Sequence, residues 1–355
     1  MAPTPQDFRA KLDAYVDPLI GKSLADAGAI KSAVLSGGLA RIELELGFPA
    51  KGYGERLLAS LREALGVEVE LKLRWTIGSH AVQRNLKPLA QIRNIIAVAS
   101  GKGGVGKSTV AANLALALKA EGASVGILDA DIYGPSQPLM LGSKDRPSSP
   151  DGKNMHPIVA LGLQAMSIGF LIDDDQPMVW RGPMVTQALN QLLTETQWHD
   201  LDYLVIDLPP GTGDIQLTLS QRIPVSGAVI VTTPQDIALL DARKGLQMFR
   251  KVEVPVLGVV ENMSTHVCGK CGHEEAIFGS GGGARLAQQY AVELLGQLPL
   301  DRRIREAADG GKPTVAAEPE GELAHRYRDI ARKAAARLAY GAPANTFPTI
   351  EITED

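Results

Sequence analysis

Residues 101–108 read Gly-Lys-Gly-Gly-Val-Gly-Lys-Ser, and this stretch decides the fold. It fits the pattern GxxxxGK[ST], in which glycines let backbone N–H groups turn inward around phosphate oxygens. An apolar run at 95–99 precedes it, and a helical pattern over 108–120 follows it. Because a strand before and a helix after are the context that the pattern requires, the stretch predicts a phosphate-binding loop at a helix N-terminus.

The loop assigns roles to its side chains as well as to its backbone. Lys107 is expected to reach the β and γ phosphates of a nucleotide, and Ser108 to ligate Mg²⁺. A second lysine, Lys102, stands where most such loops need none. The predicted nucleotide-binding residues are Gly101, Lys102, Gly103, Gly104, Val105, Gly106, Lys107, Ser108 and Thr109.

Outward from the loop, short apolar runs alternate with helical stretches. The runs lie at 95–99, 124–128, 204–206, 228–231 and 256–260. Near-continuous Val, Ile and Leu between helices is typical of parallel strands that are covered on both faces. Residues 94–340 are therefore predicted to form a doubly wound, mostly parallel α/β domain, with 135–157 as a long surface loop.

Carboxylates follow two of these runs. Asp129 and Asp131 close the run at 124–128, and Asp207 closes the strand 203–207. Because parallel strands end on one rim, where ligands bind, these groups are expected to converge. Asp129 and Asp207 are predicted metal ligands beside Ser108, and Asp131 a catalytic group that orients water. Turn or helix capping is the structural alternative for Asp129 and Asp131.

The first 76 residues predict a separate small α+β domain. Apolar residues at helical spacing run from Phe8 to Leu19, and Ile42, Leu44 and Leu46 alternate with polar neighbours like a half-buried strand. A second helix ends at Gly66, and another alternating strand follows. We expect residues 77–93 to be a linker and 341–355 a tail.

The composition excludes several classes of protein. The chain has 355 residues, of which 45% are hydrophobic and 21% charged, as in an ordinary globular protein of about two domains. A formal net charge of -4 gives no overall attraction to nucleic acid or to an anionic membrane. No apolar stretch is long enough to span a bilayer, and the N-terminus is unlike a secretory signal, so a cytoplasmic protein is expected.

The only two cysteines, Cys268 and Cys271, form a CxxC pair after the run at 256–260. Two thiolates are half of the Cys₄ set that [2Fe-2S] and [4Fe-4S] clusters usually take, and a dimer would supply the other half. A zinc site with His266 and His273 is a second interpretation, and a redox couple is a third. The spacing alone leaves all three open.

The motifs together resemble a known family. GKGGVGKST resembles the deviant P-loop of ATPases that dimerise around nucleotide, and the further motifs resemble the Mrp family of iron-sulfur carrier ATPases. These motifs are Asp129-Ala-Asp131-Ile-Tyr-Gly-Pro-Ser136, Trp180-Arg-Gly-Pro-Met184, the segment 207–214, Glu261-Asn-Met263 and the CxxC pair. The leading domain is similar to the iron-sulfur-assembly-associated domain often fused to such proteins.

The resemblance implies a homodimer that binds a [4Fe-4S] cluster between the Cys268 and Cys271 pairs of its two copies. It further implies ATP hydrolysis with Mg²⁺, loading by a cluster donor, and transfer of the cluster to apo-proteins. In that class the additional lysine, here Lys102, crosses the dimer interface to the partner's ATP phosphates. Asn262 matches the base-reading asparagine of that class. Arg181 and Met184 are candidates for the dimer seam, and a helix start packed on the sheet explains them equally well.

Two other functions remain to be weighed. A positioning ATPase would act on DNA or a membrane, and its candidate feature is a C-terminal helix with an apolar stripe and several arginines. The stripe is Leu323, Tyr327, Ile330, Ala334 and Leu338. Packing of that stripe on the sheet is the plainer interpretation, which predicts neither a nucleic-acid nor a membrane partner. The other function is a zinc-stabilised protein whose ATPase switches partner binding.

Overall fold

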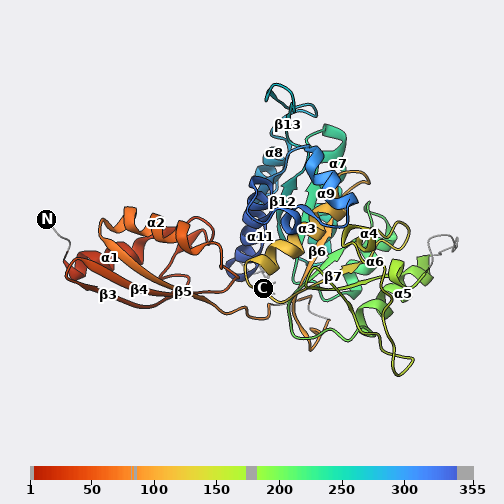
Figure 1. The fold of residues 1–355 in the computed structure, drawn as a ribbon, viewed down its shortest axis with the longest axis horizontal. Helices are drawn as coiled ribbons and strands as arrows, with labels where there is room; N and C mark the ends of the chain where they lie inside the picture. The colour runs from red at the N-terminus through yellow and green to blue at the C-terminus, as the bar shows by residue number, and fades with distance from the viewer. Residues whose placement is uncertain (1–3, 81, 84–85, 173–181, 342–355) are drawn as a thin grey trace, which may run out of the picture.

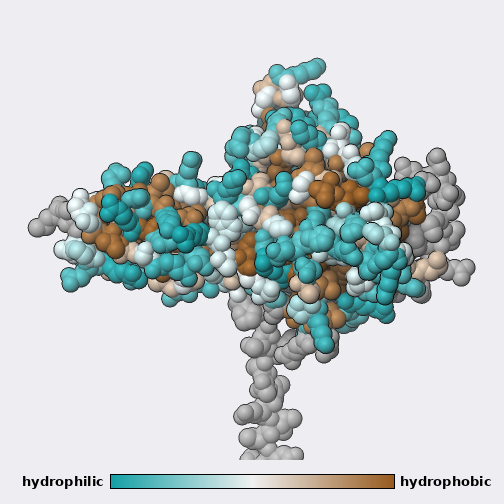
Figure 2. Space-filling view, turned by 60° about the horizontal axis from the view of Figure 1, so that its bottom comes forward, coloured by the Kyte–Doolittle hydropathy of each residue, from teal (hydrophilic) through white to brown (hydrophobic). Residues whose placement is uncertain are grey.

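The computed structural model describes residues 4–80, 82–83, 86–172 and 182–341. They form a small N-terminal lobe and a larger lobe built around one wide sheet (Figure 1). In the space-filling view the small lobe projects from the side of the large one (Figure 2). None of the helices in the described ranges combines the length and the apolar character needed to cross a membrane.

The small lobe is a three-stranded sheet, in the order β3-β4-β5, with two helices. β4 runs antiparallel to β3 and parallel to β5. Ile42, Leu44 and Leu46 are buried as the alternation predicts, and Gly66 ends the second helix in the left-handed region with φ +68°. The elements are α1 (Pro5–Ala14), β1 (Val16–Asp17), β2 (Lys22–Ser23), β3 (Ile30–Ser36), β4 (Leu39–Leu46), α2 (Gly54–Leu65) and β5 (Glu68–Trp75).

The first helix is shorter than the apolar spacing from Phe8 to Leu19 predicts. α1 ends at Ala14, and Val16 is largely exposed. The cause is the buried carboxylate of Asp17, which accepts the backbone N–H of Leu19 at 2.8 Å and the hydroxyl of Tyr53 at 2.7 Å. These bonds fix a turn in place of another helical turn, so the prediction of helical spacing through Leu19 is wrong.

The large lobe contains an eight-stranded sheet in the order β15-β12-β11-β6-β10-β7-β9-β8. All neighbouring strands are parallel except the edge pair β8 and β9, which confirms the doubly wound, mostly parallel sheet. β8, β9 and β15 were not predicted, and the central strand starts at Ile92 rather than at Ile95. The strands are β6 (Ile92–Ala99), β7 (Val125–Asp129), β8 (Ile158–Ala160), β9 (Leu163–Ser167), β10 (Leu201–Asp207), β11 (Gly227–Thr232), β12 (Val256–Glu261) and β15 (Leu294–Gln297).

Helices cover both faces of this sheet, because alternate strand residues point to opposite sides. Ile96 and Val98 join a core with α3 and α11, whereas Ile95 and Ala97 join a second core with α5, α6, α7 and α8. The helices are α3 (Lys107–Ala120), α4 (Gln137–Met140), η1 (Ile168–Phe170), α5 (Gly182–Thr194), α6 (Asp214–Arg222), α7 (Asp236–Lys251), α8 (Gly282–Gln289), α9 (Arg302–Asp309), α10 (Thr314–Ala317) and α11 (Glu322–Tyr340).

The C-terminal helix α11 packs its apolar stripe against α3, β12 and β15. Every residue of the predicted stripe is buried. Two of the arginines are also used internally, since Arg328 and Arg332 both donate to the Glu121 carboxylate. The predicted packing of the stripe is therefore confirmed, and this apolar face lies inside the protein.

The two lobes meet at the C-terminal end of the helix that follows the glycine loop. Glu121, the fully buried C-cap of α3, accepts Arg328 Nε at 2.7 Å, Arg332 Nη1 at 2.8 Å and the backbone N–H of Gly52 at 2.8 Å. At the other end of the contact, the Tyr340 hydroxyl accepts the N–H of Gly47 at 2.7 Å. A buried carboxylate thus joins both lobes.

Candidate functional site

The glycine loop lies between the end of β6 and the start of α3, as predicted. Gly104 and Gly106 have φ of +80° and +81°, values that side chains rarely adopt. A Cβ on Gly101 would collide with the backbone of Asp241 in α7, and one on Gly106 with the amide of Asn262. Gly104 is therefore required by its conformation, Gly101 by the space available, and Gly106 by both.

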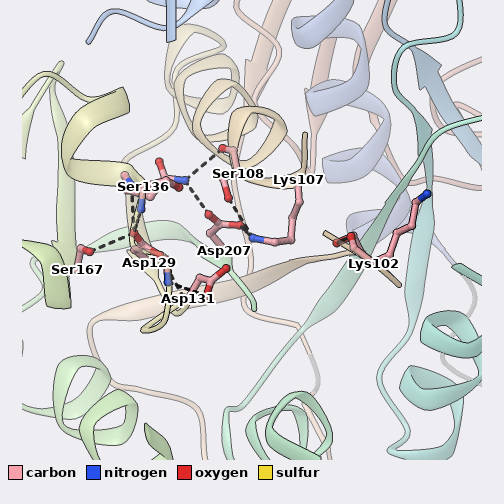
Figure 3. Close-up of polar contacts among 11 residues, drawn as sticks. Lys102, Lys107, Ser108, Asp129, Asp131, Ser136, Ser167 and Asp207 are labelled. Carbon is pink, nitrogen blue, oxygen red and sulfur yellow. Dashed lines mark hydrogen bonds and ion pairs between the residues drawn. The ribbon is translucent and has the colours of Figure 1, made fainter. Parts of the chain in front are cut away.

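Three of the predicted side chains lie close together at this loop: Lys107, Ser108 and Asp207 (Figure 3). The Lys107 ammonium is ion-paired with Asp207 Oδ1 and lies 3.1 Å from Ser108 Oγ. Asp207 ends β10 and is fully buried, and these partners offset the cost of burying its carboxylate. The structure thus brings the predicted lysine, serine and aspartate together.

Asp129 lies beside Asp207, because the two residues are register partners in β7 and β10. Its carboxylate is fully buried and accepts the N–H groups of Asp131, Ser136 and Gln137 at 2.9–3.1 Å, together with the Ser167 hydroxyl at 3.1 Å. Burial, and after it the charge of Asp207, raise its pKa to about 7, against the effect of the backbone donors.

These bonds show what Asp129 does in the described structure: it folds the loop 131–137 around its own carboxylate. This organising role is close to the capping alternative, and metal ligation by Asp129 stays a prediction. Asp131 is half-buried, and its pKa is raised, chiefly by burial.

A cavity of about 260 Å³ lies over the loop. Asp131 lines it together with the loop glycines, so the predicted water-orienting residue and the phosphate-binding backbone border the same cavity. The residues around it are Ser100, Lys102, Gly103, Gly104, Gly106, Lys107, Ser108, Thr109, Asp131, Gly134, Ser136, Met140 and Pro210. The volume and lining suit a phosphate chain rather than a large apolar ligand.

Lys102 differs from Lys107 in direction. Its side chain points away from the cluster of Lys107 and Asp207 (Figure 3). Within the part of the chain that the structure describes, its ammonium has no hydrogen bond or ion pair. A half-buried lysine at the cavity edge is thus left available for another molecule.

Asn262, which follows β12, lies behind the loop. Its Nδ2 donates to the Val105 carbonyl at 2.9 Å, and the residue is buried. This contact braces the glycine loop from the back, and base reading by Asn262 stays a prediction. Of the seam candidates, Met184 is exposed at the start of α5, whereas Arg181 lies outside the described residues.

The two cysteines lie in a hairpin that projects beyond the sheet (Figure 1). Its strands are β13 (His266–Val267) and β14 (Glu274–Glu275), which pair antiparallel. The N–H of Cys268 donates to the His273 carbonyl at 2.8 Å, and Gly272, with φ +71°, closes the turn. Both thiols are free, with Cys268 partly buried and Cys271 exposed.

Backbone N–H groups of Lys270 and Cys271, with the Cys271 side chain, lower the pKa of Cys268. A lowered thiol pKa favours the thiolate, which is the form that binds metal. His266 is held elsewhere, with Nδ1 3.0 Å from the Leu300 carbonyl. Across the described ranges, no three His, Cys, Asp or Glu side chains gather as a metal site.

Two functional positions were missed by the sequence prediction. Gln137 and Ser167 both contact the buried aspartates, yet Gln137 lies in the segment 135–157 that was predicted to be surface loop. That prediction is wrong for residues 137–140, which form α4. The only sequence feature that indicated a helix there was the Pro-Ser-Gln-Pro run at 135–138, which is equally typical of a turn.

The strand, glycine loop and helix follow one another as in P-loop NTPases, and the doubly covered parallel sheet around them has the form of that class. The fold is therefore that of a P-loop NTPase.

Comparisons with known proteins narrow the class. Residues 91–335 match the family model described as NUBPL iron-transfer P-loop NTPase, and residues 5–72 match that of an iron-sulfur cluster assembly protein. The chain is 54% identical to an iron-sulfur cluster carrier protein of Haemophilus influenzae, over 91% of this chain and 89% of that one. It belongs to the NUBPL iron-transfer P-loop NTPase family, which confirms the resemblance drawn from the motifs.

Two more relatives extend the comparison. The chain is 52% identical to the iron-sulfur cluster transfer protein NUBPL of Mus musculus, over 80% of this chain and 90% of that one. Among solved structures, a nucleotide-binding protein of Archaeoglobus fulgidus in complex with ADP aligns with a TM-score of 0.57 at 38% identity, covering 66% of this chain and 91% of that one.

Proposed function

We propose that this chain is an ATP-hydrolysing carrier that binds a [4Fe-4S] cluster between two copies of itself and transfers it to apo-proteins. The observation that carries the proposal is the hairpin: it holds the chain's only two thiols, both free, with a stabilised thiolate. One chain therefore offers half of a four-thiolate set, and a symmetric partner offers the rest. The names of the relatives support a cluster as cargo.

The cavity over the glycine loop supports ATP as the nucleotide. The Archaeoglobus fulgidus relative is described as a complex with ADP, and in this chain the glycine loop leads directly into the N-terminus of α3. A Mg²⁺ ion fits the residues, because the Lys107 ammonium already lies within contact of both Ser108 Oγ and Asp207 Oδ1. Hard oxygen ligands of this kind suit Mg²⁺, which would neutralise phosphate charge there.

Hydrolysis would use groups on both sides of the cavity. Lys107 binds phosphate oxygens, Asp131 orients the attacking water, and Lys102 of each copy reaches the nucleotide of the other. A cation delivered across the interface neutralises charge that develops on the transferred phosphoryl group. Hydrolysis would therefore require the dimer, and the dimer would also assemble the cluster site. A separate donor would load the cluster, and apo-proteins would receive it.

Anaerobic reconstitution tests the cargo. Wild-type protein should take up iron and sulfide equivalent to one [4Fe-4S] cluster per dimer, with a visible charge-transfer absorption. Cys268→Ser should lose most of that iron, because each cluster would lose two of its four thiolates. His273→Ala is the matched control and should retain the cluster, since it removes an exposed ring on the same hairpin.

Two results would contradict the proposal. Stoichiometric zinc without iron or acid-labile sulfide after anaerobic purification would favour the zinc-stabilised switch. A cluster that stays bound to monomers, or that survives in Cys268→Ser, would remove the shared site.

A further inference from the structure

Gln137, at the start of α4, connects three parts of the nucleotide site. It is 1% exposed, and its backbone N–H donates to Asp129 at 3.0 Å. Its side-chain Nε2 donates to Asp207 Oδ2 at 2.9 Å and to the Ser108 carbonyl at 3.2 Å. One amide group thus contacts both the buried aspartate at the end of β10 and the first turn of α3.

The orientation of this amide follows from its partners. Both the Asp207 carboxylate and the Ser108 carbonyl are acceptors, so the NH₂ end must face them. Gln137 also contacts the oxygen of Asp207 that Lys107 leaves free, since the lysine takes Oδ1 and the glutamine Oδ2. The two partners therefore hold the carboxylate from two sides.

The arrangement matters when phosphate arrives. A phosphate group over the glycine loop competes with Asp207 for the Lys107 ammonium, and any movement of the lysine towards phosphate removes one partner from a fully buried carboxylate. Gln137 is not part of the cavity lining, so a ligand in the cavity does not displace it. It can keep its bonds to Asp207 and Ser108 throughout.

We propose that Gln137 is a positioning residue: it holds Asp207 and the first turn of α3 in register, so that Asp207 Oδ1 and Ser108 Oγ stay directed at one shared cation. This inference rests on the proposed nucleotide site. The inference adds to that site a residue that touches neither metal nor nucleotide but controls the metal-dependent part of nucleotide affinity.

Binding of ADP to Gln137→Met tests the inference. Methionine has nearly the same length and volume but donates no hydrogen bond, so packing is kept. With Mg²⁺ present, ADP affinity should fall about tenfold to a hundredfold, the range for loss of hydrogen bonds to a charged group. With EDTA, the affinity should equal that of the wild type. Gln164→Met, on β9 and bonded to the His199 carbonyl, is the matched control and should change neither value.

A loss of ADP affinity that appears with Mg²⁺ but not with EDTA distinguishes a positioning role of Gln137 from a merely structural one. Equal losses with and without Mg²⁺, or no loss at all, would overturn the role of Gln137. Wild-type protein whose ADP affinity ignores Mg²⁺ would instead overturn the proposed metal–nucleotide site itself. Adding Gln137→Met to Asp207→Asn provides a second test, because the double variant should lose little beyond the single Asp207 change. Full additivity would contradict the inference.

Discussion

Lys102→Ala should lower the rate of ATP hydrolysis about a thousandfold, the smaller end of the effect of a cation supplied in trans to a phosphoryl transfer. The reason is the direction of the Lys102 side chain, which points away from the site of its own chain (Figure 3). Its ammonium has no partner among the described residues. Lys107, by contrast, is held by Asp207 and Ser108. ADP affinity of the isolated chain should change little. Lys153→Ala, at an exposed loop lysine, is the matched control and should keep the full rate.

Mixing two inactive variants distinguishes action in trans from action in cis. A mixed dimer of Lys102→Ala with Asp131→Ala contains one site with both groups if the lysine crosses the interface. Hydrolysis should therefore reappear on mixing. If the lysine serves its own site, neither site of the mixed dimer is complete, and a mixture that stays inactive would defeat the proposal. Full turnover by Lys102→Ala alone would defeat it at once.

The part of the site that could be predicted is local in the sequence. The loop 101–108 fixes its own conformation through Gly104 and Gly106, and it lies between a strand and a helix that each have a clear hydrophobic pattern. Asp207 could be placed at the rim because a parallel sheet brings all its strand ends to one edge. Those inferences need no knowledge of distant contacts.

The part that could not be predicted depends on distant partners. Whether Asp129 binds a metal or folds a loop depends on the N–H groups of residues 131–137 and on Ser167, which comes from another strand. Gln137 looks like an ordinary loop residue until β10 is placed beside it. The strands β8, β9 and β15, at or next to the edges of the sheet, are short, with three to five residues each, too few for a periodicity to stand out.

Glu121 is the clearest case of a distant partner overriding a local rule. A carboxylate at the C-terminal end of a helix opposes the helix dipole, and α3 also buries it completely. Arg328 and Arg332, more than 200 residues later, offset both costs, and Gly52 adds a backbone donor from the small lobe. No pattern near Glu121 indicates either arginine, so its role appears only in the folded chain.

Glu121→Ala should lower the free energy of unfolding of the large lobe by about 3–5 kcal/mol, because it leaves buried guanidinium groups without their charge partner. Arg332 keeps Asp329 at 2.7 Å, but Arg328 keeps only a 3.8 Å contact with the exposed Glu320. The Gly52 N–H also loses its acceptor, so the small lobe should separate more easily. Urea denaturation followed by tryptophan fluorescence measures the first effect, and proteolysis between the lobes the second.

Two matched variants locate the effect in the carboxylate rather than in the helix end. Glu320→Ala removes the exposed partner of the same Arg328 and should cost under about 0.5 kcal/mol, as surface ion pairs usually do. Glu121→Gln keeps an acceptor for Gly52 but not the charge, so it should fall between the two, with less separation of the lobes than Glu121→Ala. A loss below about 1 kcal/mol for Glu121→Ala would mean that water reaches the arginines and that the buried ion pair does not hold the lobes together.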